Sequence, residues 1–142
     1  MNNINKNTDA AITLWIKAAS LTRKLDASIA SVHGIGFIEY IVLHQLMNAP
    51  GKAMRRIDLA NEICRTASGI TRMLSPMEKI GLVEKADNPR DARVSLIKIT
   101  KSGEEIYKNA TNSLNEKANQ IMTHVTEKQI DGIITTLNHM NL

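Results

Sequence analysis

One stretch, residues 66–81, constrains the fold more than any other part of the chain. On a helical wheel at about 100° per residue, its apolar side chains fall on one arc and its small polar and cationic side chains on the opposite arc. The apolar arc holds Ala67, Ile70, Met73, Leu74, Met77 and Ile80. The opposite arc holds Ser68, Thr71, Arg72, Ser75 and Lys79. The stretch is therefore predicted to be a helix that packs one face against a core.

The opposite face of this helix is unusual for a solvated surface. It combines small hydroxyls with two cations, and its one acid, Glu78, lies at the edge. Hydroxyls can bond to base edges or phosphates in a DNA groove, and cations pair with phosphates. The pattern suits a DNA-binding helix, but taken alone it fits an ordinary amphipathic surface helix better.

The segments on either side of this stretch strengthen the DNA interpretation. A short helix is predicted near residues 55–63, followed by a Cys64–Arg65 connection and by Thr66 as a helix cap, which together form a helix-turn-helix. Two strand-like segments, 82–86 and 94–99, then flank a turn rich in turn-forming residues at 87–92. This hairpin would be a wing whose arginines, Arg90 and Arg93, are suited to a narrow minor groove.

The two ends of the chain form long amphipathic helices. Residues 9–32 follow a predicted cap at Thr8 and carry an apolar stripe at three- and four-residue steps. Residues 101–142 follow a predicted cap at Thr100 and carry two more stripes, separated by a capping box that runs from Thr126 to Gln129. These stripes exceed what the core of a small domain needs. The terminal helices are therefore predicted to cover one another across a two-fold axis in a homodimer.

The distribution of charge agrees with a polyanion-binding centre. The chain has 142 residues and a net charge of +4, and residues 50–101 hold eleven Lys/Arg against six Asp/Glu. The remaining residues are close to neutral. Positive charge is thus confined to the segment that contains the predicted helix-turn-helix and wing.

Other functional classes find little support in the sequence. No apolar run approaches the roughly 18 residues that cross a bilayer, and no signal-peptide core is present at the N-terminus, so a cytoplasmic protein without a membrane partner is expected. The single cysteine excludes an intrachain disulfide, and the four histidines lack the spacing of metal ligands. We predict no enzyme, no catalytic residue, no metal and no cofactor.

The sequence resembles the MarR family of winged helix-turn-helix transcription regulators, most densely from Glu39 to Gly103. The matching segments are Glu39-Tyr-Ile-Val-Leu43, Pro50-Gly51, Arg55-Arg-Ile-Asp-Leu-Ala60, Thr66-Ala-Ser-Gly-Ile-Thr-Arg-Met-Leu74, Met77-Glu-Lys-Ile-Gly-Leu-Val83, Asp91-Ala-Arg93, Val94-Ser-Leu96, Ile99-Thr100 and Gly103. The Asp-x-Arg element of the wing is the most specific of them. The resemblance implies a homodimer that binds a pseudo-palindromic operator, with a small ligand, often an aromatic acid or phenol, bound between the dimer region and the DNA-binding lobe.

The resemblance also assigns roles to residues by position. Asp91 would brace a neighbouring arginine of the wing rather than contact DNA. Trp15, Tyr40 and His44 are candidates for lining a ligand cavity, although each fits a core equally well. The predicted DNA-binding residues are Arg65, Ser68, Gly69, Thr71, Arg72, Lys79, Arg90 and Arg93.

The resulting prediction is one MarR-type domain over residues 1–142, mainly α-helical with a small β-hairpin. Its winged helix-turn-helix lobe would span residues 36–100, and residues 9–32 and 101–142 would supply the dimerisation helices. The predicted function is a sequence-specific, ligand-responsive repressor that binds double-stranded DNA as a homodimer. Two alternatives stay open: a winged-helix protein-interaction module without DNA binding, and a redox-sensing regulator that uses Cys64.

Overall fold

The computed structural model describes residues 3–142, so the first two residues of the predicted 1–142 domain lie outside it. The described part contains six α-helices, a short 3-10 helix and three strands. In chain order they are α1 (Lys6–His33), α2 (Phe37–Asn48), η1 (Pro50–Lys52), β1 (Ala53–Arg55), α3 (Arg56–Glu62), α4 (Ala67–Lys79), β2 (Val83–Ala86), β3 (Leu96–Ile99), α5 (Lys101–Ile121) and α6 (Glu127–His139). The predicted fold class, mainly α with a small hairpin, is confirmed.

A single hydrophobic core holds the winged lobe together. Leu43, Leu59, Leu74 and Ile97 are fully buried in it, which joins α2, α3, α4 and β3. Both long helices also contribute, because Ile29 of α1 and Ala110 and Leu114 of α5 are buried in the same cluster. The lobe core therefore extends beyond the predicted 36–100 boundaries, and the division into a DNA-binding lobe and dimerisation helices stays a prediction.

The wing belongs to a three-stranded antiparallel sheet in the order β1-β3-β2. The hairpin strands are shorter than predicted, and the sequence analysis missed β1, which pairs Ala53 with Lys98 and Arg55 with Leu96. Three residues are too few to show an alternating pattern. The strand forms because β3 offers an edge to the chain as it leaves the left-handed turn at Gly51 and Lys52, whose φ angles are 63° and 56°.

Helix caps largely follow the sequence prediction. The hydroxyls of Thr66 and Thr100 accept hydrogen bonds from Gly69 N and Gly103 N at 3.0 Å each, and Thr126 forms the expected capping box with Gln129. The first cap differs from the prediction. Asn5 rather than Thr8 caps α1, because the Asn5 side chain accepts a hydrogen bond from the Thr8 amide at 2.9 Å.

A tight joint connects the end of α4 to the start of α5. Gly81 adopts a left-handed φ of 79°, and the hydroxyl of Thr100 donates to its carbonyl oxygen. A Cβ atom on Gly103 would lie 2.2 Å from the carbonyl oxygen of Leu82. Only glycine fits at this crossing, which fixes α4 relative to the long helix α5.

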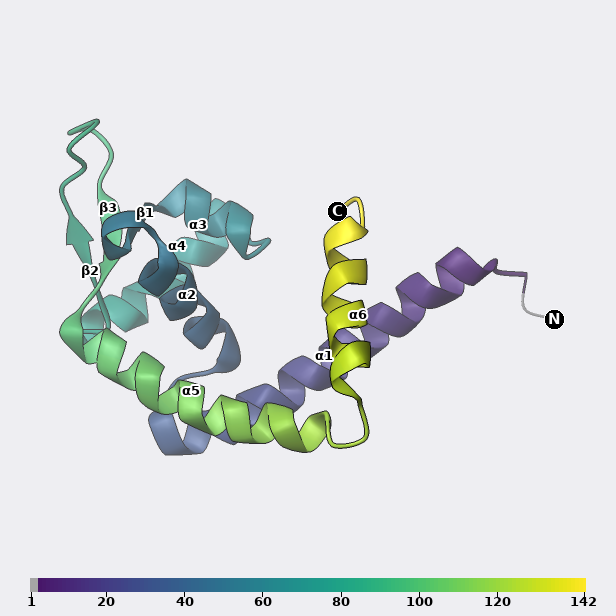
Figure 1. Cartoon of the computed structure of the whole chain (residues 1–142). Coiled ribbons are helices and arrows are strands. Elements are labelled where there is room, and N and C mark those ends of the chain that lie inside the picture. Colours follow the sequence, from purple (N-terminus) through teal and green to yellow (C-terminus); the bar gives the residue numbers. More distant parts are fainter. Residues whose placement is uncertain (1–2) are drawn as a thin grey trace.

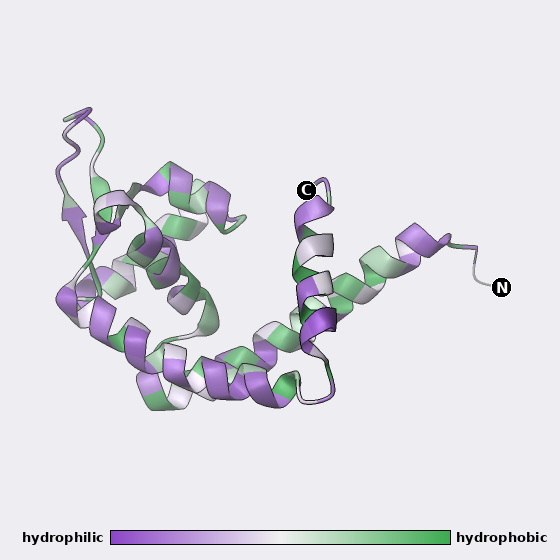
Figure 2. Cartoon of the chain, in the orientation of Figure 1, coloured by the Kyte–Doolittle hydropathy of each residue, from purple (hydrophilic) through white to green (hydrophobic). Residues whose placement is uncertain are grey.

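The terminal helices extend away from the lobe (Figure 1). No residue of α6 is buried, and the first half of α1 is exposed although it carries apolar side chains. Colouring by hydropathy shows hydrophobic positions along both of these helices as well as inside the lobe (Figure 2). No single described helix has the length and apolarity to span a membrane; only α1 and α2 together pass such a test, and they are bent by 83° relative to each other.

Candidate nucleic-acid interface

The outer face of α4 is a continuous exposed surface on the first two turns of the helix. Ser68, Thr71 and Arg72 are all exposed there, as predicted. The Thr71 hydroxyl donates to the Ala67 carbonyl at 3.2 Å, which leaves its oxygen free to accept a bond from outside. Arg72 forms no ion pair within residues 3–142. Small acceptors and one extended cation thus project together from a single helix face.

The inner face of α4 holds this surface in place. Ile70, Leu74 and Met77 are buried in the core, and Glu78 accepts a hydrogen bond from Arg56 Nη2 of α3 at 3.2 Å. The two helices of the helix-turn-helix are therefore joined by both apolar packing and a half-buried ion pair. This arrangement positions the exposed face before any ligand arrives.

The structure separates the other predicted residues of this region. Lys79 is exposed but lies eleven residues beyond Ser68, which is roughly 16 Å along the helix axis at 1.5 Å per residue. Arg65 is exposed in the α3–α4 connection, where its amide donates to the Ala60 carbonyl at 2.9 Å. The Gly69 amide is already used by Thr66, so any contact that Gly69 makes comes from its Cα surface.

The wing presents its two arginines on an ordered tip. Asp91 Oδ1 accepts hydrogen bonds from Arg93 N at 3.0 Å and Arg93 Nε at 3.1 Å. These bonds hold the pKa of Asp91 below its usual value. The Arg93 side chain is 90% exposed, and Asn88 Oδ1 accepts from Arg90 N at 3.0 Å. Asp91 thus contacts a neighbouring arginine, as predicted, and its bracing role in DNA binding stays a prediction.

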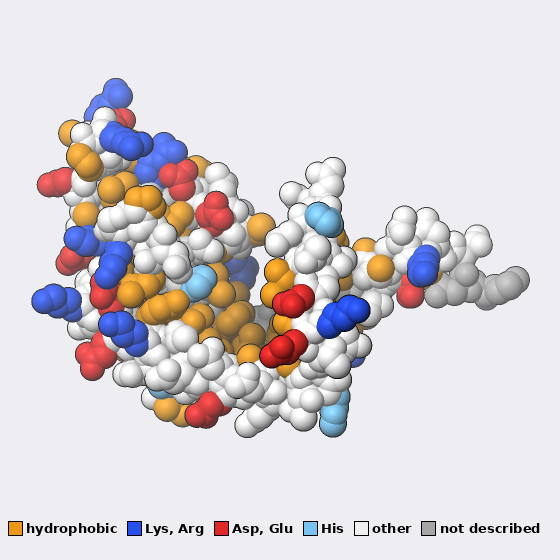
Figure 3. Space-filling view, viewed as in Figure 1, with side chains coloured by type: hydrophobic (Ala, Val, Ile, Leu, Met, Phe, Trp, Pro, Cys, Tyr) orange, Lys and Arg blue, Asp and Glu red, His pale blue; other side chains and the backbone are white. Residues whose placement is uncertain are grey.

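Basic side chains lie at the wing (Figure 3). In the space-filling view, Lys and Arg side chains lie on the wing and along the outer edge of the lobe, with Asp and Glu side chains between them, while hydrophobic side chains gather on the inner side that faces α6. The two faces of the lobe differ in chemistry. One is suited to a polyanion and the other to apolar contacts.

Two of the three ligand-cavity candidates lie together. The rings of Tyr40 and His44 stack with centroids 6.3 Å apart, and Tyr107 of α5 joins them, with its ring centroid 5.1 Å from that of Tyr40. His44 Nδ1 and Tyr107 Oη are 2.9 Å apart, and Tyr40 Oη lies 2.8 Å from Thr111 Oγ1. Burial raises the pKa of the Tyr40 hydroxyl. Tyr107 was not predicted as part of this cluster, since nothing in its local sequence pattern distinguishes it from a surface tyrosine.

Trp15 lies apart from this aromatic cluster. Its side chain is 73% exposed, and it lines a shallow hollow formed by α1 residues alone. Within the single chain, the structure therefore does not bring Trp15 to Tyr40 and His44.

An apolar groove of about 980 Å³ runs between α1 and α6. Leu14, Ile133 and Leu137 are among its lining residues, and each is more than a third exposed in the single chain. Gly132 also faces the groove with open space around it. The groove is a surface that residues 3–142 leave uncovered.

The remaining candidates for reactive chemistry are Cys64 and a possible group of metal ligands. Cys64 is exposed and has a left-handed φ of 54° in the α3–α4 connection. Across residues 3–142, no three His, Cys, Asp or Glu side chains gather as metal ligands would.

These features define a winged helix-turn-helix protein, and comparisons with known proteins show which family it resembles. The model of the MarR family matches residues 39–95, which run from α2 to the wing. The HTH-type transcriptional regulator FarR of Neisseria gonorrhoeae is 33% identical over 64 residues, or 45% of this chain and 44% of FarR. The HTH-type transcriptional regulator BilQ of Clostridioides difficile (strain CD3) is 26% identical over 81 residues, or 57% of this chain and 55% of BilQ.

The fold is similar to that of solved MarR-family structures over almost the whole chain. Sco3205, a MarR family transcriptional regulator from Streptomyces coelicolor that was solved in complex with DNA, superposes with a TM-score of 0.83. The superposition covers 97% of this chain and 88% of Sco3205, at 21% identity. The chain aligns with only about half the length of the two curated relatives. The chain thus resembles the MarR family in the sequence of residues 39–95 and in its overall fold.

Proposed function

We propose that this chain is a transcriptional regulator that binds double-stranded DNA in a sequence-specific manner as a homodimer. The observation that carries the proposal is the exposed face of α4, with Ser68, Thr71 and Arg72, held beside an arginine-bearing wing. The relative solved with DNA, Sco3205, shares this fold. A regulator of this kind acts in the cytoplasm and needs no catalytic group.

In this mechanism α4 enters a major groove and the wing enters the adjacent minor groove. Arg72 donates to base edges, where a bidentate guanidinium contact favours guanine, and Thr71 and Ser68 accept or donate beside it. Arg93 follows the narrow minor groove, where Asp91 limits its rotamers, and Arg90 contacts the DNA backbone beside that groove. Arg65 and Lys79, at opposite ends of α4, pair with phosphates and set the register.

A second copy of the chain is the proposed occupant of the groove between α1 and α6. Large apolar side chains exposed there, including Ile133 and Leu137, have no partner within the described part of the chain. A two-fold dimer would place two α4 helices on one side of the duplex, about 34–36 Å apart, and would select a pseudo-palindromic site.

The aromatic cluster on α2 and α5 is the proposed site of a small aromatic acid or phenol. His44 is partly exposed and offers a ring for stacking, and its imidazole and the Tyr107 hydroxyl offer hydrogen bonds. A ligand that binds better to one lobe spacing than to another lowers operator affinity by its differential affinity. The proposed regulator is accordingly a ligand-responsive repressor.

Selection of bound fragments from random duplex DNA tests the function directly. The expected result is an enriched pseudo-palindrome whose half-sites lie one helical turn apart. A protein that enriches no sequence, or that remains monomeric at micromolar concentration, contradicts the proposal. A match to a half-site alone would retain DNA binding and remove the dimer.

A further inference from the structure

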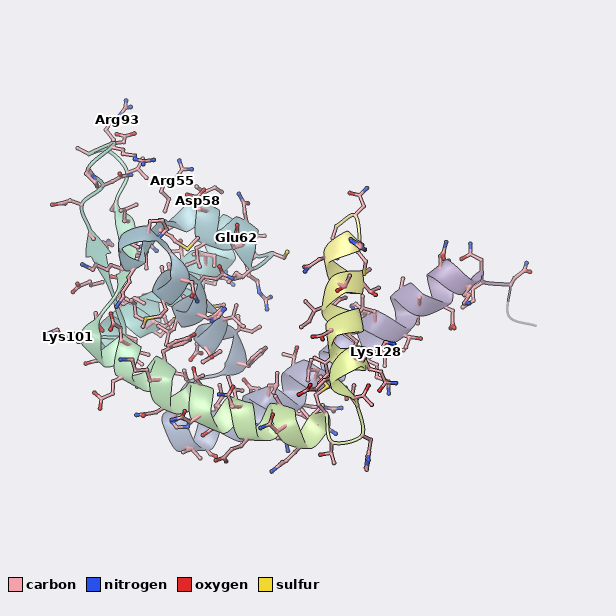
Figure 4. All side chains as sticks on the ribbon, in the orientation of Figure 1. Arg55, Asp58, Glu62, Arg93, Lys101 and Lys128 are labelled. Atoms are coloured by element: carbon pink, nitrogen blue, oxygen red, sulfur yellow. The ribbon has the colours of Figure 1, made fainter. Side chains whose placement is uncertain are left out.

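Two arginines from different elements line one small hollow between α3 and the wing. The hollow has a volume of about 350 Å³, and its walls are formed by Arg55, Asp58, Asn88, Arg90, Asp91 and Val94. Arg55 and Asp58 lie together at the start of α3, below the wing that carries Arg93 at its tip (Figure 4). Neither Arg55 nor Asp58 was among the residues that the sequence predicted to contact DNA.

Arg55 is held in one orientation by Asp58. Its Nε donates to Asp58 Oδ2 at 2.7 Å, and its Nη2 donates to Asp58 Oδ1 at 2.9 Å. A guanidinium has five N–H donors, so this two-point contact leaves three of them free to point elsewhere. The contact also holds the pKa of Asp58 below its usual value, so that the carboxylate stays charged at neutral pH.

Arg90 faces the same hollow from the wing. Its amide is fixed by Asn88 Oδ1 at 3.0 Å, and its side chain forms no ion pair in the part of the chain described. The hollow thus has Arg55, whose charge Asp58 cancels, on one wall and Arg90, unpaired within residues 3–142, on the other. Asp91 also lines the hollow, and its carboxylate is paired with Arg93 at 3.1 Å.

If the chain binds DNA as proposed above, the DNA backbone passes close to this hollow. The inference therefore rests on the proposed function. If α4 occupies a major groove and the wing the adjacent minor groove, one sugar-phosphate backbone must pass between them, because that backbone separates the two grooves. The hollow lies beside this path, since its walls are the wing and the first turn of the helix-turn-helix.

We propose that this hollow seats one phosphate of the DNA backbone, to which Arg55 and Arg90 donate, and that Asp58 is a positioning residue that orients Arg55 while cancelling its charge. The site takes the anionic phosphate diester group and reads no base. Arg55 then contributes directed hydrogen bonds with little net attraction for polyanions in general.

This arrangement limits non-specific binding. An uncompensated cation at a phosphate releases a counterion, and each such contact steepens the dependence of log affinity on log salt by about 0.9. The hydrogen bonds of Arg55 require a phosphate in the hollow, which is reached when α4 and the wing are both seated. Asp58 therefore favours docked complexes over loose electrostatic ones.

The two residues of this pair give opposite predictions. Arg55→Ala weakens binding to a selected site by about tenfold, because a charge-assisted contact to the backbone is lost, and weakens binding to random duplex much less, because that contact requires a docked complex. Asp58→Asn strengthens binding to random duplex at low salt and steepens its salt slope by about 0.9, since Arg55 becomes an uncompensated cation. The ratio of selected-site to random affinity falls in Asp58→Asn.

Glu104→Gln provides a matched control. Glu104 also forms a short ion pair, with Lys52 Nζ at 2.8 Å, and its substitution changes the net charge by the same amount. It lies one turn into α5, whose first residue, Lys101, is well separated from Arg55 in Figure 4. Beyond a Debye length of about 10 Å, the added charge should leave the salt slope unchanged.

The measurement is affinity by fluorescence anisotropy over a salt series for wild type and the three variants, with thermal melting as a check of folding. If Arg55→Ala and Asp58→Asn shift the affinity for random duplex in the same direction, the pair is only structural and the proposal fails. Equal slopes for Asp58→Asn and Glu104→Gln would reduce the effect to net charge and overturn it as well. Wild type that binds no duplex removes the proposed function together with this inference, whereas wild type that binds normally beside an unchanged Asp58→Asn removes this inference alone.

Discussion

The winged lobe and the terminal helices contain the same kinds of apolar side chain in opposite surroundings. In the lobe, Ile70, Leu74 and Ile97 are fully buried in the shared hydrophobic core. In α6, Ile133, Ile134 and Leu137 are between 41% and 54% exposed. Both sets follow helical or strand periodicity, so periodicity alone does not show what will cover a stripe.

This difference indicates that the two regions depend on different kinds of contact for stability. The lobe buries its apolar area within one chain, where each large side chain contributes about 1.5–3 kcal/mol. The outer half of α1 and all of α6 can gain that free energy only from a further surface, which we propose to be a second copy. If the lobe is stable alone and α6 is stable only in a dimer, the same substitution should lower the stability of the lobe but shift the dimer equilibrium when it is made in α6.

The largest difference is expected from two matched leucine truncations. Leu74→Ala in the lobe should lower the free energy of unfolding by about 3 kcal/mol, because a fully buried side chain is replaced by a cavity. Leu137→Ala in α6 should instead shift the equilibrium from dimer towards monomer. Urea unfolding and sedimentation velocity at two protein concentrations distinguish these effects. A Leu137→Ala variant whose dimer stays intact would contradict the proposal that a second copy covers α6.

Two glycines give a second matched pair with opposite signs. Gly103→Ala places a methyl group 2.2 Å from the Leu82 carbonyl oxygen and should destabilise the lobe by about 2 kcal/mol. Gly132→Ala meets nothing within 4 Å in the single chain, and should favour α6 by about 1 kcal/mol through helix propensity. Circular dichroism and thermal melting at dilutions that populate monomer provide the measurement. A stable Gly103→Ala variant would show that the α4–α5 joint is less tight than described.

Arg72→Ala separates the effect on DNA binding from the effects on folding and dimer formation. Because Arg72 is exposed and unpaired in the described structure, its loss should leave thermal stability and dimer formation unchanged. Its affinity for the selected site should fall by about 1–3 kcal/mol, as for loss of a bidentate base contact. Anisotropy titrations with selected and random duplexes provide the test. An equal loss on both duplexes would assign Arg72 to the backbone instead.

The smallest effect concerns the ion pair that connects η1 to α5. Lys52 holds the pKa of Glu104 below its usual value, so the pair stabilises the fold above the unfolded pKa and loses that contribution as the pH falls through the folded one. The stability difference between wild type and Glu104→Gln should therefore shrink between about pH 5 and pH 3. Melting temperatures over this range measure it, and a constant difference would mean that the pair does not contribute.

The candidate site was predicted in part from the sequence. The α4 face could be predicted because Ser68, Thr71 and Arg72 recur at helical spacing opposite an apolar stripe, and the wing because turn formers separate two strand-like runs. Arg55 and Asp58 were missed even though their i, i+3 spacing allows an ion pair on one turn. Their position beside the wing depends on the hairpin, which lies about thirty residues further along the chain.

The sequence by itself determined the local elements of this protein, because caps, turns and apolar periodicity act over a few residues. Thr66, Thr100 and Thr126 each cap the helix that they were expected to cap. Only the tertiary structure decided which stripes are buried, that β1 pairs with β3, and that Arg55 shares a hollow with Arg90. Those outcomes depend on contacts between distant segments, whose free energies are set by how whole elements pack rather than by any local pattern.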